Sequence, residues 1–205
     1  TAGWRDLPER QRSMRAVLAH SWNLLDEHAR AILARLSVFE GGFTRRAAAE
    51  VAGAQARDLQ ALAHRSLLSR RQVGRYEMHE LIHHYAAEAL EARGDDEAVR
   101  EAHARAFVER VTARRERLQA AASPAARAEL RPDVADIRAA AVWAVTHWQS
   151  HEVAPLLQAL TIMWVAQVDP AGPPVMRELA RVIDDERDRA LDAGVAAPMR
   201  TKLAG

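Results

Sequence analysis

The chain has 205 residues and contains no cysteine. That absence excludes disulfide scaffolds, zinc sites built from thiolates and cysteine nucleophiles. Charge of one sign is also lacking, because 29 basic residues almost balance 28 acidic ones, so the net charge predicts no general attraction to nucleic acid or acidic membranes. No apolar run approaches the roughly 20 residues of a membrane span, and no signal peptide opens the chain. We therefore expect a cytoplasmic protein without membrane contact.

Lysine is nearly missing as well. The only one is Lys202, which stands between Thr201 and Leu203. A Walker A loop needs a Gly-Lys-Ser/Thr sequence after a strand, so that the lysine can reach the phosphates of a nucleotide. The chain therefore has no phosphate-binding loop of its own, and we predict that it is not an enzyme. Because it begins at Thr1 rather than at methionine, we expect it to be part of a longer protein.

Apolar residues recur at helical spacing through the first third of the chain, where alanine and arginine are abundant and runs of β-branched residues are scarce. The pattern predicts a helix over residues 12–25 and a second one that begins at the N-cap Asp26 and stops near Gly41. Thr44 is expected to cap a third, short helix that ends at Gly53, and a fourth helix is predicted over residues 56–66.

The pattern then changes to two short segments, residues 67–71 and 75–78, around Gln72-Val73-Gly74. This arrangement predicts a small β-hairpin in which glycine provides the positive φ of the turn. A helix is expected to follow over residues 79–94. Helices followed by a hairpin and another helix are the outline of a winged-helix domain with a hairpin wing, which we assign to residues 1–93.

Only helices are predicted after Asp95. They cover residues 97–121, 133–149, 153–168 and 175–191, with Pro124 and Pro132 bracketing a break. Helices joined by short loops favour antiparallel pairs, as in tetratricopeptide repeats, although the strict consensus of that repeat is missing. The predicted fold is therefore mainly α, with a winged helix followed at residues 94–205 by the start of a helical, repeat-like sensor domain.

The string His79-Glu80-Leu81-Ile82-His83 matches the H-E-x-x-H motif of zinc proteases, in which two histidines on one helical face bind the metal. A zinc protease also needs a third ligand and a sheet edge that holds the substrate. Glu97 and Glu101 follow at plausible distances in sequence, but no sheet beyond the hairpin is predicted. On a helical wheel His79 lies at the edge of the apolar stripe and His83 faces outward, so a metalloprotease is the remote alternative and we expect no metal.

Five blocks of the first part of the chain follow one another in a recognisable order. They are Ser21-Trp22-Asn23-Leu24-Leu25, Leu36-Ser37-Val38-Phe39-Glu40-Gly41-Gly42-Phe43-Thr44, His64-Arg65-Ser66-Leu67-Leu68, Gly74-Arg75-Tyr76-Glu77-Met78-His79-Glu80-Leu81 and Tyr85-Ala86. In this order they resemble the winged-helix region after the nucleotide-binding core of bacterial STAND ATPases, relatives of the NB-ARC proteins, many of which are transcriptional regulators. A later block, Asp136-Ile137-Arg138-Ala139-Ala140 with Trp143-Ala144, resembles the start of their helical sensor region.

The resemblance implies a role for one histidine. In NB-ARC proteins the helix after the wing opens with Met-His-Asp, whose histidine contacts the β-phosphate of bound ADP. Met78, His79 and Glu80 match that motif, with glutamate in place of aspartate. His79 is therefore expected to contact ADP in the full-length parent, which would use ADP and ATP, whereas this chain alone would hold no cofactor. The alternative is that His79 only caps the helix and packs against Tyr76 or Tyr85.

Two readings of function follow. The first, implied by the resemblance, is a non-catalytic regulatory fragment that couples an upstream nucleotide-binding domain of the same chain to a protein or small-molecule signal on the helical region, through a two-state switch. The alternative is a DNA-binding winged-helix regulator whose hairpin would contact phosphates. The balanced charge and the few base-reading side chains at 56–66 argue against it, so nucleic acid is not an expected partner. Its candidate contacts are Arg65, Arg70, Arg71 and Arg75.

Overall fold

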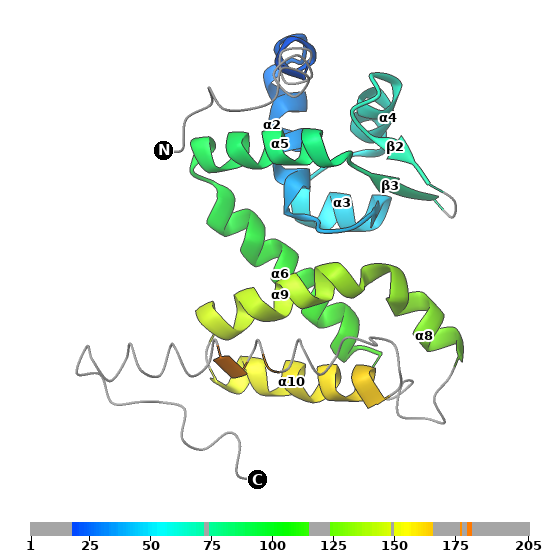
Figure 1. Cartoon of the computed structure of the whole chain (residues 1–205), viewed down its shortest axis with the longest axis vertical. Helices are drawn as coiled ribbons and strands as arrows, with labels where there is room; N and C mark the ends of the chain where they lie inside the picture. The colour runs from blue at the N-terminus through cyan, green and yellow to red at the C-terminus, as the bar shows by residue number, and fades with distance from the viewer. Residues whose placement is uncertain are drawn as a thin grey trace, which may run out of the picture. The chain divides into compact units, whose positions relative to one another are not determined.

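The computed structural model describes residues 18–71, 74–114, 124–148 and 150–165, together with positions 177, 180 and 181. The chain divides into two compact units, Thr1–Val99 and Arg100–Gly205, and Figure 1 shows that both are built largely from helices. The prediction of a mainly helical fold with a small β-hairpin is confirmed. The division into functional domains at residue 93 stays a prediction, and most of the helix expected at 175–191 lies outside the described residues.

The helices of the first unit begin and end close to where the sequence predicts. Residues 18–23 are helical, α2 spans Glu27–Arg35 and continues as the 3-10 helix η2 over Leu36–Val38. Then come α3 (Arg45–Ala52), α4 (Ala56–His64) and α5 (Glu80–Arg93). The predicted caps are present, since the side chains of Asp26 and Thr44 accept the N–H groups of Ala29 and Ala47 at 2.7 and 3.2 Å.

The end of α4 differs from the prediction, which extended this helix to residue 66. The helix stops at His64, and Ser66 takes the left-handed conformation with φ of 59°. Leu67 then donates its N–H back to the carbonyl of Leu62 at 3.0 Å, which is the pattern that terminates a helix and turns the chain sharply. Leu67 and Leu68 are buried directly after the turn, so the chain leaves α4 along a fixed path.

The sheet has three strands, where the sequence predicted only a two-stranded hairpin. β2 (Ser69–Arg70) and β3 (Arg75–Glu77) form the hairpin, and β1 (Phe43–Thr44) pairs with the other edge of β3, so the order is β1-β3-β2. All pairings are antiparallel. β1 was missed because two residues are too few to show the alternation of a strand. Figure 1 shows the hairpin extending beside α4, with Gly74 at φ of 71° closing its turn.

The core of the first unit lies between α2, α4, α5 and the sheet. Helix α5 packs against α2, and Trp22 meets Tyr85 edge to face at 5.2 Å between ring centres. Two ion pairs tie the ends of these helices together, Arg35 with Asp95 at 2.9 Å and Arg93 with Glu27 at 2.6 Å. The fully buried large side chains here are Leu33, Leu36, Phe43, Leu59, Leu62 and Leu90.

The second unit is helical in all its described segments. It contains most of α6 (Asp96–Thr112), then α8 (Pro124–Leu130), the 3-10 helix η4 (Arg131–Asp133), α9 (Val134–His147) and α10 (Ser150–Val165). The break predicted between Pro124 and Pro132 is wrong, because α8 begins at Pro124 itself. Proline is well tolerated at the first position of a helix, where the N–H that it lacks would have no partner within the helix. Figure 1 shows α9 and α10 packed side by side in opposite directions, as predicted.

A buried polar network holds part of this second unit together. His103 on α6 contacts Asp136 on α9 at 3.0 Å, and Arg110 contacts Asp133 at 2.8 Å. Both carboxylates are buried.

Among the described residues, no helix combines the length and the apolar composition needed to cross a membrane.

Candidate nucleic-acid interface

Helices α3 and α4 form a helix-turn-helix. The turn begins at Gly53, whose φ of 68° ends α3, and the N–H of Ala54 returns to the carbonyl of Ala48 at 3.1 Å. At the start of α4 the side chain of Asp58 accepts the N–H of Gln55 at 2.8 Å. The other oxygen of Asp58 lies 3.3 Å from His28 on α2. These contacts fix the position of α4 relative to the two helices behind it.

Helix α4 presents one polar face to solvent and one apolar face to the core. Leu59 and Leu62 are buried, whereas Arg57, Gln60 and His64 are exposed. These three residues are spaced by three and four positions, so they share one helical face. Arginine can donate hydrogen bonds to base edges in a major groove, whereas glutamine and histidine can both donate and accept. These three polar side chains of α4 therefore lie together on a single exposed surface.

A groove runs between α4 and the hairpin. Four arginines line it, together with a glutamine, a glycine and a tyrosine; the lining residues are Arg45, Gln60, Arg70, Arg71, Gly74, Arg75 and Tyr76. The guanidinium of Arg70 lies 5.9 Å from the ring centre of Tyr76, within the range of a cation–π contact. Within the part of the chain that the structure describes, Arg45 and Arg70 form no ion pair. We call this feature the basic groove.

The structure brings together three of the four arginines proposed from sequence. Arg70, Arg71 and Arg75 line the basic groove, whereas Arg65 does not and instead donates to the carbonyl of Leu24 at 3.0 Å. Arg45 was missed. It opens α3 directly after β1, and the pairing of β1 with β3 places Thr44 opposite Arg75. Because β1 was not predicted, no signal in the sequence brought Arg45 to the hairpin.

The charges in the first unit are segregated by sequence and by surface. Residues 42–75, which contain α3, α4 and most of the hairpin, hold seven arginines and two acidic residues. The flanking segments 25–41 and 76–91 together hold two arginines and seven acidic residues. The near-zero net charge of the whole chain hides this separation. A local excess of positive charge is what a polyanion encounters.

His79 precedes α5 and is exposed. Its Nδ1 accepts the N–H of Leu81 at 3.3 Å, so the imidazole is the N-cap of this helix. The alternative reading of His79 as a helix cap is consistent with this contact. A phosphate contact in a longer protein is untested by it and stays a prediction.

His83 lies one turn further along α5, and the prediction that it faces outward is wrong. Its side chain is half-buried, and its Nε2 lies 3.1 Å from the carbonyl oxygen of Phe39. The cause is the packing of α5 against η2 and the segment after it, which the helical wheel did not include. His83 therefore ties α5 to the loop that leads into β1.

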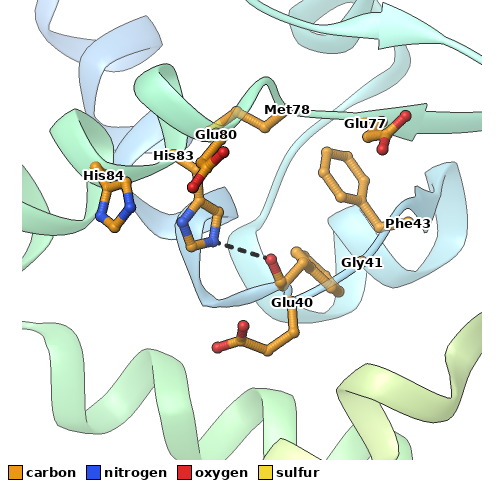
Figure 2. A pocket seen from close by; sticks show the side chains of 9 residues that line it. Glu40, Gly41, Phe43, Glu77, Met78, Glu80, His83 and His84 are labelled. Atoms are coloured by element: carbon orange, nitrogen blue, oxygen red, sulfur yellow. Dashed lines mark hydrogen bonds between the residues drawn. The ribbon is translucent and has the colours of Figure 1, made fainter. Parts of the chain in front are cut away.

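Figure 2 shows a second hollow, on the side of the hairpin that carries the acidic residues. Three glutamates and two histidines surround a partly apolar floor, and His83 points at the backbone beside Glu40. We call it the acidic pocket; its lining residues are Phe39, Glu40, Gly41, Phe43, Glu77, Met78, Glu80, His83 and His84. His79 is not among them. Within the described residues no three potential ligands lie close enough to hold a metal ion, so the zinc-protease alternative gains no support.

Residues 25–91 match the family described as a winged helix-turn-helix domain. No curated protein and no solved structure matches the chain. Nothing in these comparisons supports the STAND ATPase or tetratricopeptide-like context suggested by the sequence blocks. The matched segment begins just before α2 and ends within α5, so it covers the helix-turn-helix, the three-stranded sheet and the helix that supports them. Residues 25–91 are therefore a winged helix-turn-helix domain.

Proposed function

We propose that residues 25–91 are the DNA-binding part of a non-catalytic regulator. The observation that carries the proposal is the basic groove, where Arg45, Arg70 and Arg75 lie beside the exposed polar face of α4. In helix-turn-helix proteins the second helix of the motif enters the major groove. The geometry supports α4 in that role and the hairpin as a wing on the sugar-phosphate backbone. The proposal reverses the expectation that nucleic acid is not a partner.

The contacts divide by kind. Arginines of the basic groove would bind phosphates, which fix the position and register of the domain but read no sequence. Arg57, Gln60 and His64 would face the bases, where arginine favours guanine and glutamine favours adenine. Because few side chains read bases while several bind phosphates, we expect strong salt dependence and modest sequence preference.

The test is a titration of the purified chain with a labelled random duplex, followed by fluorescence anisotropy between about 50 and 200 mM salt. Arg70→Ala is expected to weaken binding about tenfold, the scale of one hydrogen bond to a charged group. It should also reduce the salt slope by about 0.9, which corresponds to one phosphate.

Arg46→Ala is the matched control. Arg46 is the exposed neighbour of Arg45 in sequence, but it pairs with Glu50 at 2.6 Å along α3 and does not line the basic groove. It should change affinity less than about twofold, as expected for an exposed pair outside the contact. Equal losses from Arg46→Ala and Arg70→Ala would contradict the proposed interface, and absence of salt-dependent binding by the unaltered chain would contradict the function.

A second candidate is the coupling role implied by the resemblance to STAND regulators, and the position of His79 favours it. Because Nδ1 of this exposed histidine accepts an N–H, the proton of the neutral ring is on Nε2, which leaves a donor at the start of a helix. Such a donor suits the β-phosphate of ADP held by an upstream domain. In this candidate function, the second unit would receive a protein or small-molecule signal, as the resemblance implies.

The test of this candidate uses the longer protein that the candidate implies, with a nucleotide-binding domain upstream of this chain. His79→Ala should loosen ADP about tenfold to hundredfold without altering DNA binding by the isolated chain. His79→Asn is the control, since asparagine preserves the helix cap but provides a shorter side chain. Unchanged ADP retention in both variants would reduce His79 to a structural cap.

A further inference from the structure

The hairpin carries an ion pair that joins its two differently charged sides. Nε of Arg71 donates to Oε2 of Glu77. Arg71 lines the basic groove, whereas Glu77 lines the acidic pocket together with Glu40 and Glu80. Figure 2 shows Glu77 at the end of β3 on the pocket side. Glu77 is thus an acidic residue placed one contact away from the proposed phosphate-binding surface.

We infer that Glu77 restrains DNA binding by competing with phosphate for Arg71. This inference rests on the proposed function and adds a residue that limits affinity at the same surface. Both partners of the pair are accessible, with 67% of the Arg71 side chain and 41% of the Glu77 side chain exposed. A phosphate can therefore approach Arg71 from solvent and compete with the carboxylate of Glu77 for the guanidinium.

Displacement of the Glu77 carboxylate from Arg71 by a phosphate has an electrostatic cost. An exposed ion pair is weak, so a phosphate can displace the carboxylate. Once Arg71 has turned to the phosphate, Glu77 loses its cation and remains in the lining of the acidic pocket, to which Glu40 and Glu80 contribute the same charge. It also remains close to the incoming polyanion. Both repulsions act against the complex and not against the free domain, so Glu77 lowers affinity without being needed for the fold.

The neighbouring pair on α3 provides a contrast. Arg46 and Glu50 also form an exposed ion pair, but they lie along one helix and neither residue lines the basic groove. Removal of Glu50 adds the same unit of charge to the domain. Any effect specific to Glu77 must therefore exceed the effect of Glu50.

The experiment is a double-mutant cycle on the purified chain, with the random duplex and salt series already described. Glu77→Gln is expected to raise affinity about two- to fivefold at low salt, the scale of an exposed ion pair. It should also steepen the salt slope by up to about 0.9, because Arg71 then neutralises a phosphate fully. In an Arg71→Ala background the same substitution should change affinity less than about twofold, and Glu50→Gln should do no more.

The outcomes separate the two proposals. If Glu77→Gln gives the same gain with and without Arg71, or no gain at all while the unaltered chain binds DNA, the competition is refuted and the DNA-binding function stands. If no variant binds the duplex, both proposals fail. Thermal melts check that each variant is folded, and Glu77→Thr, which keeps a residue suited to a strand, repeats the removal if glutamine destabilises the hairpin.

Discussion

The two sides of the winged helix-turn-helix domain differ in charge although they share one hairpin. The basic groove takes its arginines from α3, β2, the turn and β3, whereas the acidic pocket takes its glutamates from the segment after η2, from β3 and from the start of α5. Arg71 and Glu77 meet where these two surfaces adjoin. The difference teaches that a chain with a net charge of +1 can still present a concentrated positive surface. The net charge adds arginines and glutamates together, whereas the fold places them on different surfaces.

Loss of the shared core should abolish both surfaces together, and this is the largest effect we expect. Leu59 is fully buried in α4. Leu59→Ala should lower the free energy of unfolding by about 2–5 kcal/mol, from lost burial and the cavity it leaves. Urea unfolding followed by circular dichroism measures the change. His64→Ala, on the exposed face of the same helix, should leave stability within about 0.5 kcal/mol; equal losses would contradict the assignment of the two faces.

Charge reversal should affect only the basic side. Under the proposed function, Arg45→Glu combined with Arg70→Glu should weaken duplex binding roughly hundredfold, since two charged contacts are lost and two repulsions are added. Glu40→Gln combined with Glu80→Gln, in the acidic pocket, should change binding less than about threefold. Anisotropy at low salt measures both. A similar loss from the two double variants would remove the distinction between the surfaces.

Much of this domain was predictable from the sequence, and the misses share a cause. Asp26 and Thr44 begin helices and Gly53 ends one, as the sequence predicts. These three positions were predictable because a helix cap depends only on a few neighbouring residues. β1, the place of Arg45 and the direction of His83 depend instead on segments that are far apart in sequence. A helical wheel or a two-residue segment does not indicate which distant segment will pack against it.

The two histidines of the H-E-x-x-H string should differ in their effect on stability. His83→Ala should lower the free energy of unfolding by about 1–2 kcal/mol, because the imidazole lost is the partner of the carbonyl of the buried residue Phe39. His79→Asn should change it by less than about 0.5 kcal/mol, since asparagine is itself a good N-cap. Thermal melts compare the two. A zinc site would instead make both substitutions equally damaging, and only when zinc is present.

The smallest expected effect concerns the pair outside both surfaces. Glu50→Gln removes the partner of Arg46 on the exposed side of α3. An ion pair of this spacing on a helix contributes about 0.3–0.5 kcal/mol, so the melting temperature should fall by no more than a few degrees. A loss of stability as large as that expected for His83→Ala would contradict the description of Arg46 and Glu50 as an exposed ion pair on the surface of α3.

The left-handed turn at Ser66 has a consequence for the kind of duplex that the domain accepts. Four residues join α4 to β2, and two of them, Leu67 and Leu68, are buried. The spacing between the helix and the hairpin is therefore restrained by a short connection that is anchored in the core. Under the proposed function, we therefore expect the domain to bind B-form DNA, whose wide major groove admits α4, in preference to A-form RNA, whose major groove is too narrow for a helix.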